Sequence, residues 1–313
     1  MKKKRIYRFV DRRKQKWLTA GIILCAAVFA VCAFLLIRYA VQYRQAGEAS
    51  QALQEIYHAE EIHEPLPTAA PAHSASPVPT AVLLPAATPL HAAETTPAPW
   101  QGNYPLNPYL AVRSPFTELQ KKNPDIIGWL TAEGLLDQAV VQRDNEYYLK
   151  RDYLKKSNDN GALFLDEACS LRTRPPFYMI YGHNMKSGAM FGALHSYGHL
   201  SYYKQHPLLT FNTQYEEGTF VIFSVCDLPV STLAKGLALY RKMDERKYLD
   251  FIREIQIQSL YSSVLPMNEQ DQLLLLVTCT GDDNSRRVVA ARRLRDTETA
   301  QSVTALIGQV RSQ

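Results

Sequence analysis

The sequence contains no pair of cysteines at the CxxC spacing and no glycine-rich phosphate-binding loop. The first absence excludes the commonest thiolate zinc sites, and the second excludes a P-loop nucleotide site. Because the zinc-site spacing is missing, we predict that the chain holds no metal ion. No internal repeat is found either, so a solenoid is not expected.

Most of the chain also lacks an excess of positive charge. The formal net charge is +5, but the first 16 residues hold nine Lys and Arg and one Asp, so the rest of the chain is net negative. A nucleic-acid-binding domain needs a basic face on its folded part. Nucleic acid is therefore not expected as a partner.

One long apolar run follows the basic tail. Trp17–Ile37 has 21 residues with one Thr as its only polar member, enough to cross a bilayer core of about 30 Å at about 1.5 Å per residue. A cleaved signal peptide is the alternative, but its apolar region is shorter and ends on a small-residue site. We predict a cytoplasmic tail over residues 1–16 and a retained transmembrane helix over 17–40, because positive flanks stay in the cytoplasm.

Two segments of different composition separate this span from the folded part. Residues 41–64 are rich in Ala, Gln and Glu and predict a helical stalk. Residues 65–108 carry 11 of the 18 prolines, a composition that favours extended chain without a core. We interpret them as a disordered linker through the cell wall, with a proline-rich docking peptide as the alternative. Residues 109–313 then form an extracytoplasmic globular domain.

That domain contains three cysteines, Cys169, Cys226 and Cys279. Because three is odd, at least one thiol is free or pairs with another chain. Whether Cys169 and Cys226 form a disulfide stays open, and we treat them as structural thiols. A free thiol outside the membrane is a candidate for function.

Short apolar segments bounded by turn residues predict a mainly β domain. The strand candidates are "QAVVQ", "GALFLD", "PPFYMIYG", "GTFVIFSVCDL", "DQLLLLVTC" and "RRVVAARRL". Ser114 is a candidate N-cap for a short helix with Pro115 at its first position. Residues 243–261 predict an amphipathic helix from the spacing of Tyr248, Phe251, Ile252 and Ile255. Many strands with few helices favour a β-barrel or sandwich.

The strand that ends on Cys279 is followed by a polar turn and by two arginines, Arg286 and Arg287. A nucleophilic thiol needs a base or cation beside it and a donor for the oxyanion that develops. In an antiparallel hairpin, directly paired residues point to the same face, and the numbers of each pair add up to the same sum. If that sum is even, Cys279 shares a face with Arg287. If it is odd, Cys279 shares a face with Arg286. Spacing alone leaves both arginines open.

Among the histidines of the domain, His183 is the best candidate for acid–base chemistry. It follows the strand segment "FYMIYG" within "YGHNM", and the loop at the end of a strand is where catalytic groups are often displayed. Taken alone, however, the residue is better explained as an ordinary polar residue than as a catalytic one.

The segments "LLVTC" and "YGHNMKSGAMFGAL" resemble the cysteine and histidine motifs of the class B sortases. "NPDIIGWL", "VVQRDNEYYLKRDY" and "NGALFLD" resemble earlier segments of that class in the same order. The resemblance covers about residues 116–294. It implies a closed sortase-like β-barrel with short peripheral helices, including one before the cysteine strand.

The resemblance implies a membrane-anchored cysteine transpeptidase of Gram-positive bacteria that acts on peptide bonds. Such an enzyme cleaves a C-terminal sorting signal of a secreted protein through a thioacyl intermediate. It then passes the acyl group to an amine of a cell-wall precursor or a pilin, without a cofactor. Carried over by position, Cys279 is the nucleophile, His183 the acid and base, and Arg287 the oxyanion-stabilising cation, which predicts the even-sum register.

Three further residues match positions that bind substrate in the family, namely Asn145, Leu149 and Thr278. For Leu149, simple core packing is an equal alternative. The sequence departs from the family at Leu275, where the motif has Thr, and at Ala139, where Pro is common. Residues 227–240 match poorly, so the sorting motif, the acceptor amine and the choice between protein anchoring and pilus assembly stay open, as does the oligomeric state.

Two other functions remain as alternatives. A tethered cysteine peptidase uses the same Cys and His but transfers the acyl group to water. A non-catalytic cell-wall scaffold needs no thiol chemistry and forms no thioacyl adduct.

Overall fold

The computed structural model describes residues 12–61, 104, 106–242, 245–262, 264–279 and 284–312. Its contacts divide the chain into two compact units, Met1–Glu48 and Ala49–Gln313. Most of the predicted cytoplasmic tail and nearly all of the predicted linker lie outside the described residues. The second unit starts inside the predicted stalk, so the last turns of the stalk belong to it.

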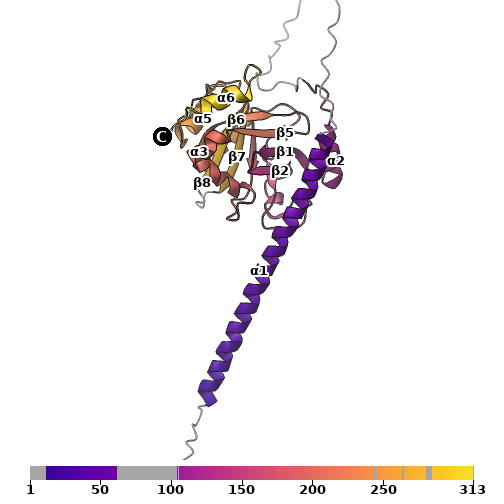
Figure 1. Cartoon of the computed structure of the whole chain (residues 1–313), viewed down its shortest axis with the longest axis vertical. Coiled ribbons are helices and arrows are strands. Elements are labelled where there is room, and N and C mark those ends of the chain that lie inside the picture. The colour runs from indigo at the N-terminus through magenta and orange to yellow at the C-terminus, as the bar shows by residue number, and fades with distance from the viewer. Residues whose placement is uncertain are drawn as a thin grey trace, which may run out of the picture. The chain divides into compact units, whose positions relative to one another are not determined.

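Within the described residues, eight strands form one closed barrel in the order β1-β2-β3-β4-β7-β8-β6-β5. Figure 1 shows strands of this barrel with helices around them. This confirms the predicted closed β-barrel. The strands are β1 (Ile126–Ala132), β2 (Leu136–Val141), β3 (Leu163–Leu165), β4 (Phe177–Tyr181), β5 (Leu208–Thr213), β6 (Thr219–Pro229), β7 (Leu273–Cys279) and β8 (Ser285–Arg293). All six predicted strand segments are strands, whereas β1 and β5 were not predicted.

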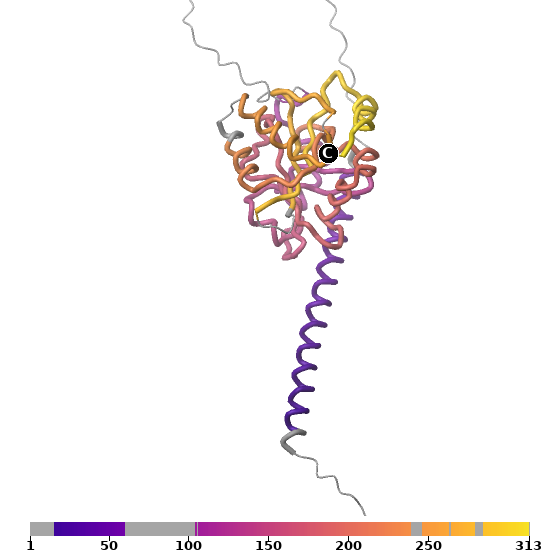
Figure 2. Tube along the Cα trace, turned by 90° about the vertical axis from the view of Figure 1, so that its left-hand side faces the viewer, coloured from indigo at the N-terminus to yellow at the C-terminus, as the bar shows by residue number. Residues whose placement is uncertain are grey.

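Short helices surround the barrel. The α-helices of the second unit besides α1 are α2 (Ser114–Lys122), α3 (Leu200–Gln205), α4 (Val230–Lys242), α5 (Glu245–Ile257) and α6 (Ala300–Ile307), and the 3₁₀ helices are η1 (Tyr147–Lys150) and η2 (Phe191–Gly198). The N-cap of α2 is Arg113 rather than Ser114, so that prediction was wrong by one residue. Figure 2 shows the last part of the chain, which includes α6, in yellow at the periphery of this unit.

Strand β7 is buried along its described side chains, from Leu273 to Thr278. Strands β4 and β8 flank it, and α5 lies over the neighbouring strand β6, where the Ser224 hydroxyl donates to the carbonyl of Ile255 at 3.0 Å. Because successive side chains of β7 point to opposite faces and all of them from Leu273 to Thr278 are buried, both faces of the strand are covered. This explains why "LLLLV" is a continuous apolar run and not an alternating one.

Helix α1 (Arg12–Glu61) contributes its last turns to the second unit. The ring of Tyr57 stacks on Trp129 of β1, with centroids 4.3 Å apart and planes within 4°. Asn212 of β5 donates to the Tyr57 hydroxyl at 2.7 Å. Tyr57 is only 2% exposed, so the barrel buries this side of the helix.

A carboxylate next to the stack makes further contacts with the helix. Asp137 of β2 accepts from the indole N–H of Trp129 at 2.6 Å and lies 2.9 Å from Nε2 of His58. The amide of Gln54 donates to the backbone carbonyl of Asp137 at 2.6 Å. The turns of α1 that precede the proline-rich segment are therefore attached to the barrel.

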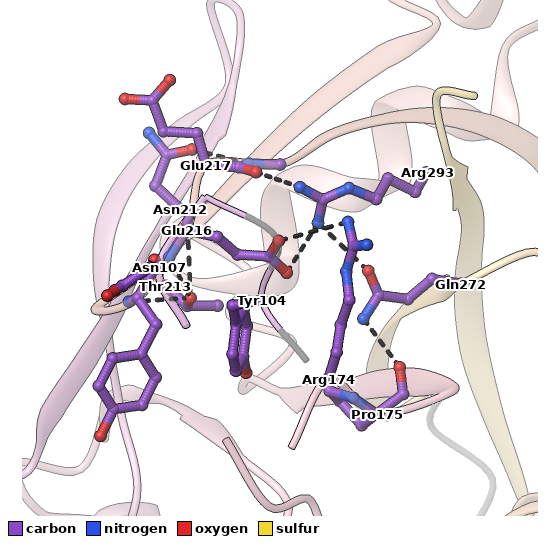
Figure 3. A network of polar contacts seen from close by, with 12 residues as sticks. Tyr104, Asn107, Arg174, Pro175, Asn212, Thr213, Glu216, Glu217, Gln272 and Arg293 are labelled. Atoms are coloured by element: carbon purple, nitrogen blue, oxygen red, sulfur yellow. Dashed lines mark hydrogen bonds and ion pairs between the residues drawn. The ribbon is translucent and has the colours of Figure 1, made fainter. Parts of the chain in front are cut away.

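A half-buried ionic network lies at the barrel end where β4 and β7 begin (Figure 3). Glu216 accepts from Arg293 at 3.0 Å and lies 3.3 Å from Arg174. Gln272 accepts from Arg293 at 3.2 Å and donates to the Pro175 carbonyl at 2.8 Å. Burial lowers the pKa of Arg293, and the Glu216 charge opposes this shift. The chemistry of the predicted site lies at the other end of these strands.

The first described residue of the predicted linker, Tyr104, lies near the C-terminal end of that segment and is anchored to the barrel. Tyr104 is 1% exposed, and its hydroxyl donates to the Leu171 carbonyl at 2.8 Å. Burial is the main cause that raises the pKa of Tyr104. Segments on both sides of residues 62–103 therefore belong to the same compact unit.

Candidate active site

The parallel strands β4 and β7 bring the predicted histidine and cysteine to the same end of the barrel. Tyr181 of β4 pairs with Val277 of β7, and the Gly182 N–H donates to the Val277 carbonyl at 3.2 Å. His183 therefore follows β4 at the level where Cys279 ends β7. The pairing of two parallel strands brings these residues to one end of the barrel although they lie far apart in the sequence.

The β7–β8 hairpin has the odd-sum register. Cys279 pairs with Arg286, and Thr278 pairs with Arg287. The even-sum register predicted from the family resemblance is therefore wrong. The described pairs run without a register shift from Leu273 to Cys279, and β8 is also held against β6, where Asp227 pairs with Arg287. The two neighbouring strands thus fix which arginine shares a face with Cys279.

Arg287 forms an ion pair with a carboxylate on the neighbouring strand. Its Nη2 lies 3.0 Å from Oδ2 of Asp227, and its Nε donates to Oδ1 of the same side chain. The hydrogen bond to Asp227 raises the pKa of Arg287. This bidentate pair fixes the orientation of the guanidinium. Sequence reasoning missed Asp227, which lies in the poorly matching segment at the end of β6.

Arg286 lies on the other face of β8, the face that includes Tyr181. Tyr181, Val277 and Cys279 share this face by the strand pairing. Burial raises the pKa of Tyr181, the Asp166 carboxylate adds to this, and the charge of Arg286 opposes it. Arg286 also donates to the Ser285 carbonyl at 2.7 Å. A cation thus lies across the ladder from the cysteine position.

Thr278 contacts the histidine segment. Its hydroxyl donates to the Gly182 carbonyl at 2.7 Å, and the residue is only 3% exposed. The hydroxyl therefore ties β7 to the residue before His183. Sequence reasoning assigned Thr278 to substrate binding, and this hydrogen bond gives it a second role in holding the two strands together.

Leu149 lies in η1 and is 37% exposed. Its backbone carbonyl lies 2.7 Å from Nε2 of His183. Gly161 makes room for this contact, because a Cβ there would lie 3.0 Å from Cδ2 of His183. The exposed side chain of Leu149 is accessible to a ligand, while its carbonyl orients the histidine.

The side chain of Asn145 forms hydrogen bonds with neighbouring protein groups beside the candidate site. Its amide donates to Asp166 at 3.2 Å and its side-chain oxygen accepts from the Glu167 N–H at 3.0 Å. The Tyr181 hydroxyl donates to the same carboxylate of Asp166 at 2.9 Å. Asn145 thus joins the loop after β2 to the loop after β3.

The other two cysteines of this unit are free and buried. Burial raises the pKa of each thiol, Cys169 and Cys226, from 9.0 to about 12. Both are therefore neutral thiols at physiological pH, which makes them poor nucleophiles.

His195 and His199 have the i, i+4 spacing of a helical ligand pair. However, Nε2 of His195 lies 2.9 Å from the side-chain oxygen of Asn184. Within the described part of the chain, no three His, Cys, Asp or Glu side chains are grouped to hold a metal ion.

Comparison with known proteins points to one family, although no family model matches the chain. Sortase B of Listeria monocytogenes is 29% identical over 174 residues, which are 54% of this chain and 68% of that protein. Sortase B of Staphylococcus aureus is 26% identical over 188 residues, 58% of this chain and 75% of that protein.

The chain is a homologue of the class B sortases. Its fold agrees with the solved structures as well. Bacillus anthracis sortase B has a TM-score of 0.59 at 24% identity, covering 82% of this chain and 98% of that one. The S. aureus sortase B–substrate complex has a TM-score of 0.54 at 25% identity, covering 59% and 87%. The homology supports a cysteine transpeptidase of the sortase family.

Two residues of this sortase homologue were not predicted from its sequence. Asp227 follows Cys226 at the end of a predicted strand, where it reads as an ordinary turn residue. Gly161 has a φ of +64°, and a glycine before a strand is a weak signal for such a conformation. Both depend on contacts between segments distant in the sequence.

Proposed function

We propose that this chain is a membrane-anchored transpeptidase that cleaves a C-terminal sorting signal and transfers the acyl group to an amine. Cys279 is the nucleophile, and His183 protonates the departing amine and later accepts a proton. Arg286 stabilises the oxyanion. The family resemblance favoured Arg287 for this last role, but that choice depended on a register that the hairpin does not have.

The observation that carries the proposal is the meeting of three strands at one barrel end. β7 ends on Cys279, β4 leads into His183 beside it, and β8 brings Arg286 directly across from Cys279. Acyl transfer by a thiol requires a base and a cation close to that thiol.

Asn145, Leu149 and Thr278 are proposed to line the substrate groove. The exposed side chain of Leu149 is the best placed of the three to contact a peptide. Asn145 and Thr278 use their polar groups within the protein, so they act mainly by shaping the groove.

Helix α1 supports the membrane anchor. By length and composition, its segment Lys16–Ala59 could cross a membrane. In this proposal the N-terminus is cytoplasmic and the catalytic unit is extracellular. The partners are secreted proteins with a sorting signal and an amine of peptidoglycan precursor or pilin.

The full chain in detergent micelles provides the test. It is incubated with a library of five-residue sorting peptides, and adducts are identified by intact-mass spectrometry. The expected result is a thioacyl adduct that Cys279→Ala abolishes and that an added amine converts into an amide product. Cys226→Ala is the matched control and keeps the adduct.

The alternatives give other outcomes. A peptidase releases the acid at the same rate with or without the amine. A scaffold forms no adduct with any peptide, although the protein is folded by circular dichroism.

A further inference from the structure

His183 is held by a contact that lies outside the barrel strands. Its Nε2 is 2.7 Å from the carbonyl oxygen of Leu149. A carbonyl oxygen only accepts hydrogen bonds, so the nitrogen that faces it has to carry a proton. A neutral imidazole has one N–H, which here belongs to Nε2, and its lone pair then belongs to Nδ1.

The turn that supplies this carbonyl is fixed by its own contacts. The Ala162 N–H donates to the Tyr148 carbonyl at 3.1 Å. Asp144 accepts from the Tyr147 N–H at 2.7 Å, which lowers the pKa of that carboxyl. The guanidinium of Arg143 lies 3.9 Å from the centre of the Tyr147 ring. The acceptor for His183 is therefore pre-positioned by η1.

Gly161 is what allows the turn and the imidazole to meet. Its φ is +64°, and a Cβ would lie 2.6 Å from the Tyr148 oxygen and 3.0 Å from both the Leu149 oxygen and Cδ2 of His183. Any side chain would push apart the two partners of the hydrogen bond. Glycine therefore satisfies both the conformation and the space.

We propose that Leu149 and Gly161 are positioning residues that hold His183 through Nε2, so that Nδ1 is the nitrogen that transfers protons in the reaction. This inference rests on the proposed transpeptidase function. It assigns the proton path to one atom of the ring.

In this proposal His183 transfers one proton in each half of the reaction. Nδ1 first takes the proton of the Cys279 thiol, which gives a thiolate and an imidazolium. The thiolate bonds to the substrate carbonyl carbon, the C–N bond breaks, and the same proton passes from Nδ1 to the departing amine. In the second half, the acceptor amine bonds to the acyl carbon and the S–C electron pair returns to sulfur. Nδ1 takes the proton that the amine loses, and Nε2 keeps its own proton throughout.

The tautomer can be measured directly in the full chain in detergent micelles, labelled with ¹⁵N-histidine. His183→Gln identifies the signals of His183. In the neutral form we expect Nε2 to resonate as the protonated nitrogen and Nδ1 as the unprotonated one. The reverse tautomer would overturn the proposal.

Two glycines with similar backbone conformations give a matched pair of variants. Gly161→Ala is expected to abolish the single tautomer and to lower kcat about 10²-fold with little change in KM, as for a misplaced catalytic group. Gly134 has a φ of +69°, and a Cβ added there would meet no heavy atom within 4 Å. Gly134→Ala should leave both readouts unchanged.

Retention of the Nε2 tautomer and of kcat in Gly161→Ala would refute the positioning role. If that variant does not fold, the tautomer of the wild-type protein decides the proposal by itself. Absence of any thioacyl adduct in the wild type would refute the proposed function instead, and the tautomer would still be measurable.

Discussion

Cys279 pairs with Arg286 across the β7–β8 ladder, while its neighbour Thr278 pairs with Arg287. Successive residues of a strand point to opposite faces. The side chains of the two adjacent arginines therefore lie on opposite faces of the sheet. Arg287 forms an ion pair with Asp227 on its own face.

This relationship predicts opposite outcomes for the two arginines. Arg286→Ala should lower the rate of thioacyl formation by about 10²- to 10³-fold, the usual effect of removing one oxyanion donor. Arg287→Ala should retain much more activity and lose about 0.2–1 kcal/mol of stability, because its ion pair with Asp227 is partly exposed to solvent. Single-turnover kinetics and urea unfolding measure the two effects. An inactive Arg287→Ala beside an active Arg286→Ala would restore the assignment that the family resemblance favoured.

The Thr278 hydroxyl gives a second prediction. Thr278→Val keeps the shape of the side chain but leaves the Gly182 carbonyl without its donor, which should cost about 1–3 kcal/mol for a buried acceptor. Thr278→Ser keeps the hydroxyl and should be close to wild type in both unfolding free energy and kcat. Equal behaviour of the two variants would mean that the hydrogen bond to Gly182 contributes nothing.

The contact between Tyr57 and Trp129 predicts that the end of α1 stabilises the barrel. Tyr57→Ala should lower the free energy of unfolding by about 3–5 kcal/mol, as for a buried aromatic side chain. Urea unfolding of the full chain, followed by Trp129 fluorescence after Trp17→Phe and Trp100→Phe, provides the measurement. Tyr43→Ala is the control on the same helix, since Tyr43 is 45% exposed. An unchanged midpoint for Tyr57→Ala would show that the docked turns are not part of the folding unit.

The buried thiols predict a dependence on pH. In the folded protein Cys169 and Cys226 keep their protons up to a pKa of about 12, against 9.0 for an ordinary thiol. Their contribution to stability is therefore complete below pH 9 and is lost as the pH rises from 9 to 12, because the unfolded thiols ionise first. The stability of Cys169→Ala/Cys226→Ala should fall less steeply over this range, as urea unfolding at a series of pH values would measure.

The same thiols give a simple test by alkylation. At about pH 8, near the ordinary pKa of a thiol, iodoacetamide should modify Cys279 in the folded catalytic unit but should spare Cys169 and Cys226, and urea should expose all three. Peptide mapping reads the sites. Rapid modification of Cys226 in the folded protein would contradict its burial.

Several parts of the fold could be predicted from the sequence because their signals are local. The amphipathic spacing of Tyr248, Phe251, Ile252 and Ile255 predicts α5, and all four side chains are buried. Strand β5 was missed although its burial alternates regularly, because "LLTFNT" is short and weakly apolar. Strand β1 was missed although Asn123 and Pro124 separate it from α2, because "IIGWLTA" is buried on both faces and shows no alternation.

The sequence by itself determined the kind of chemistry: an apolar helix, a cysteine that ends a buried strand, and histidine and arginine motifs in the order of the sortases. Only the tertiary structure decided which arginine faces the cysteine and where the end of α1 packs. Because β7 is buried on both faces, it has no alternating pattern that could reveal its register. The pairing of β8 with both β6 and β7 sets that register, and such pairing joins residues far apart in the chain.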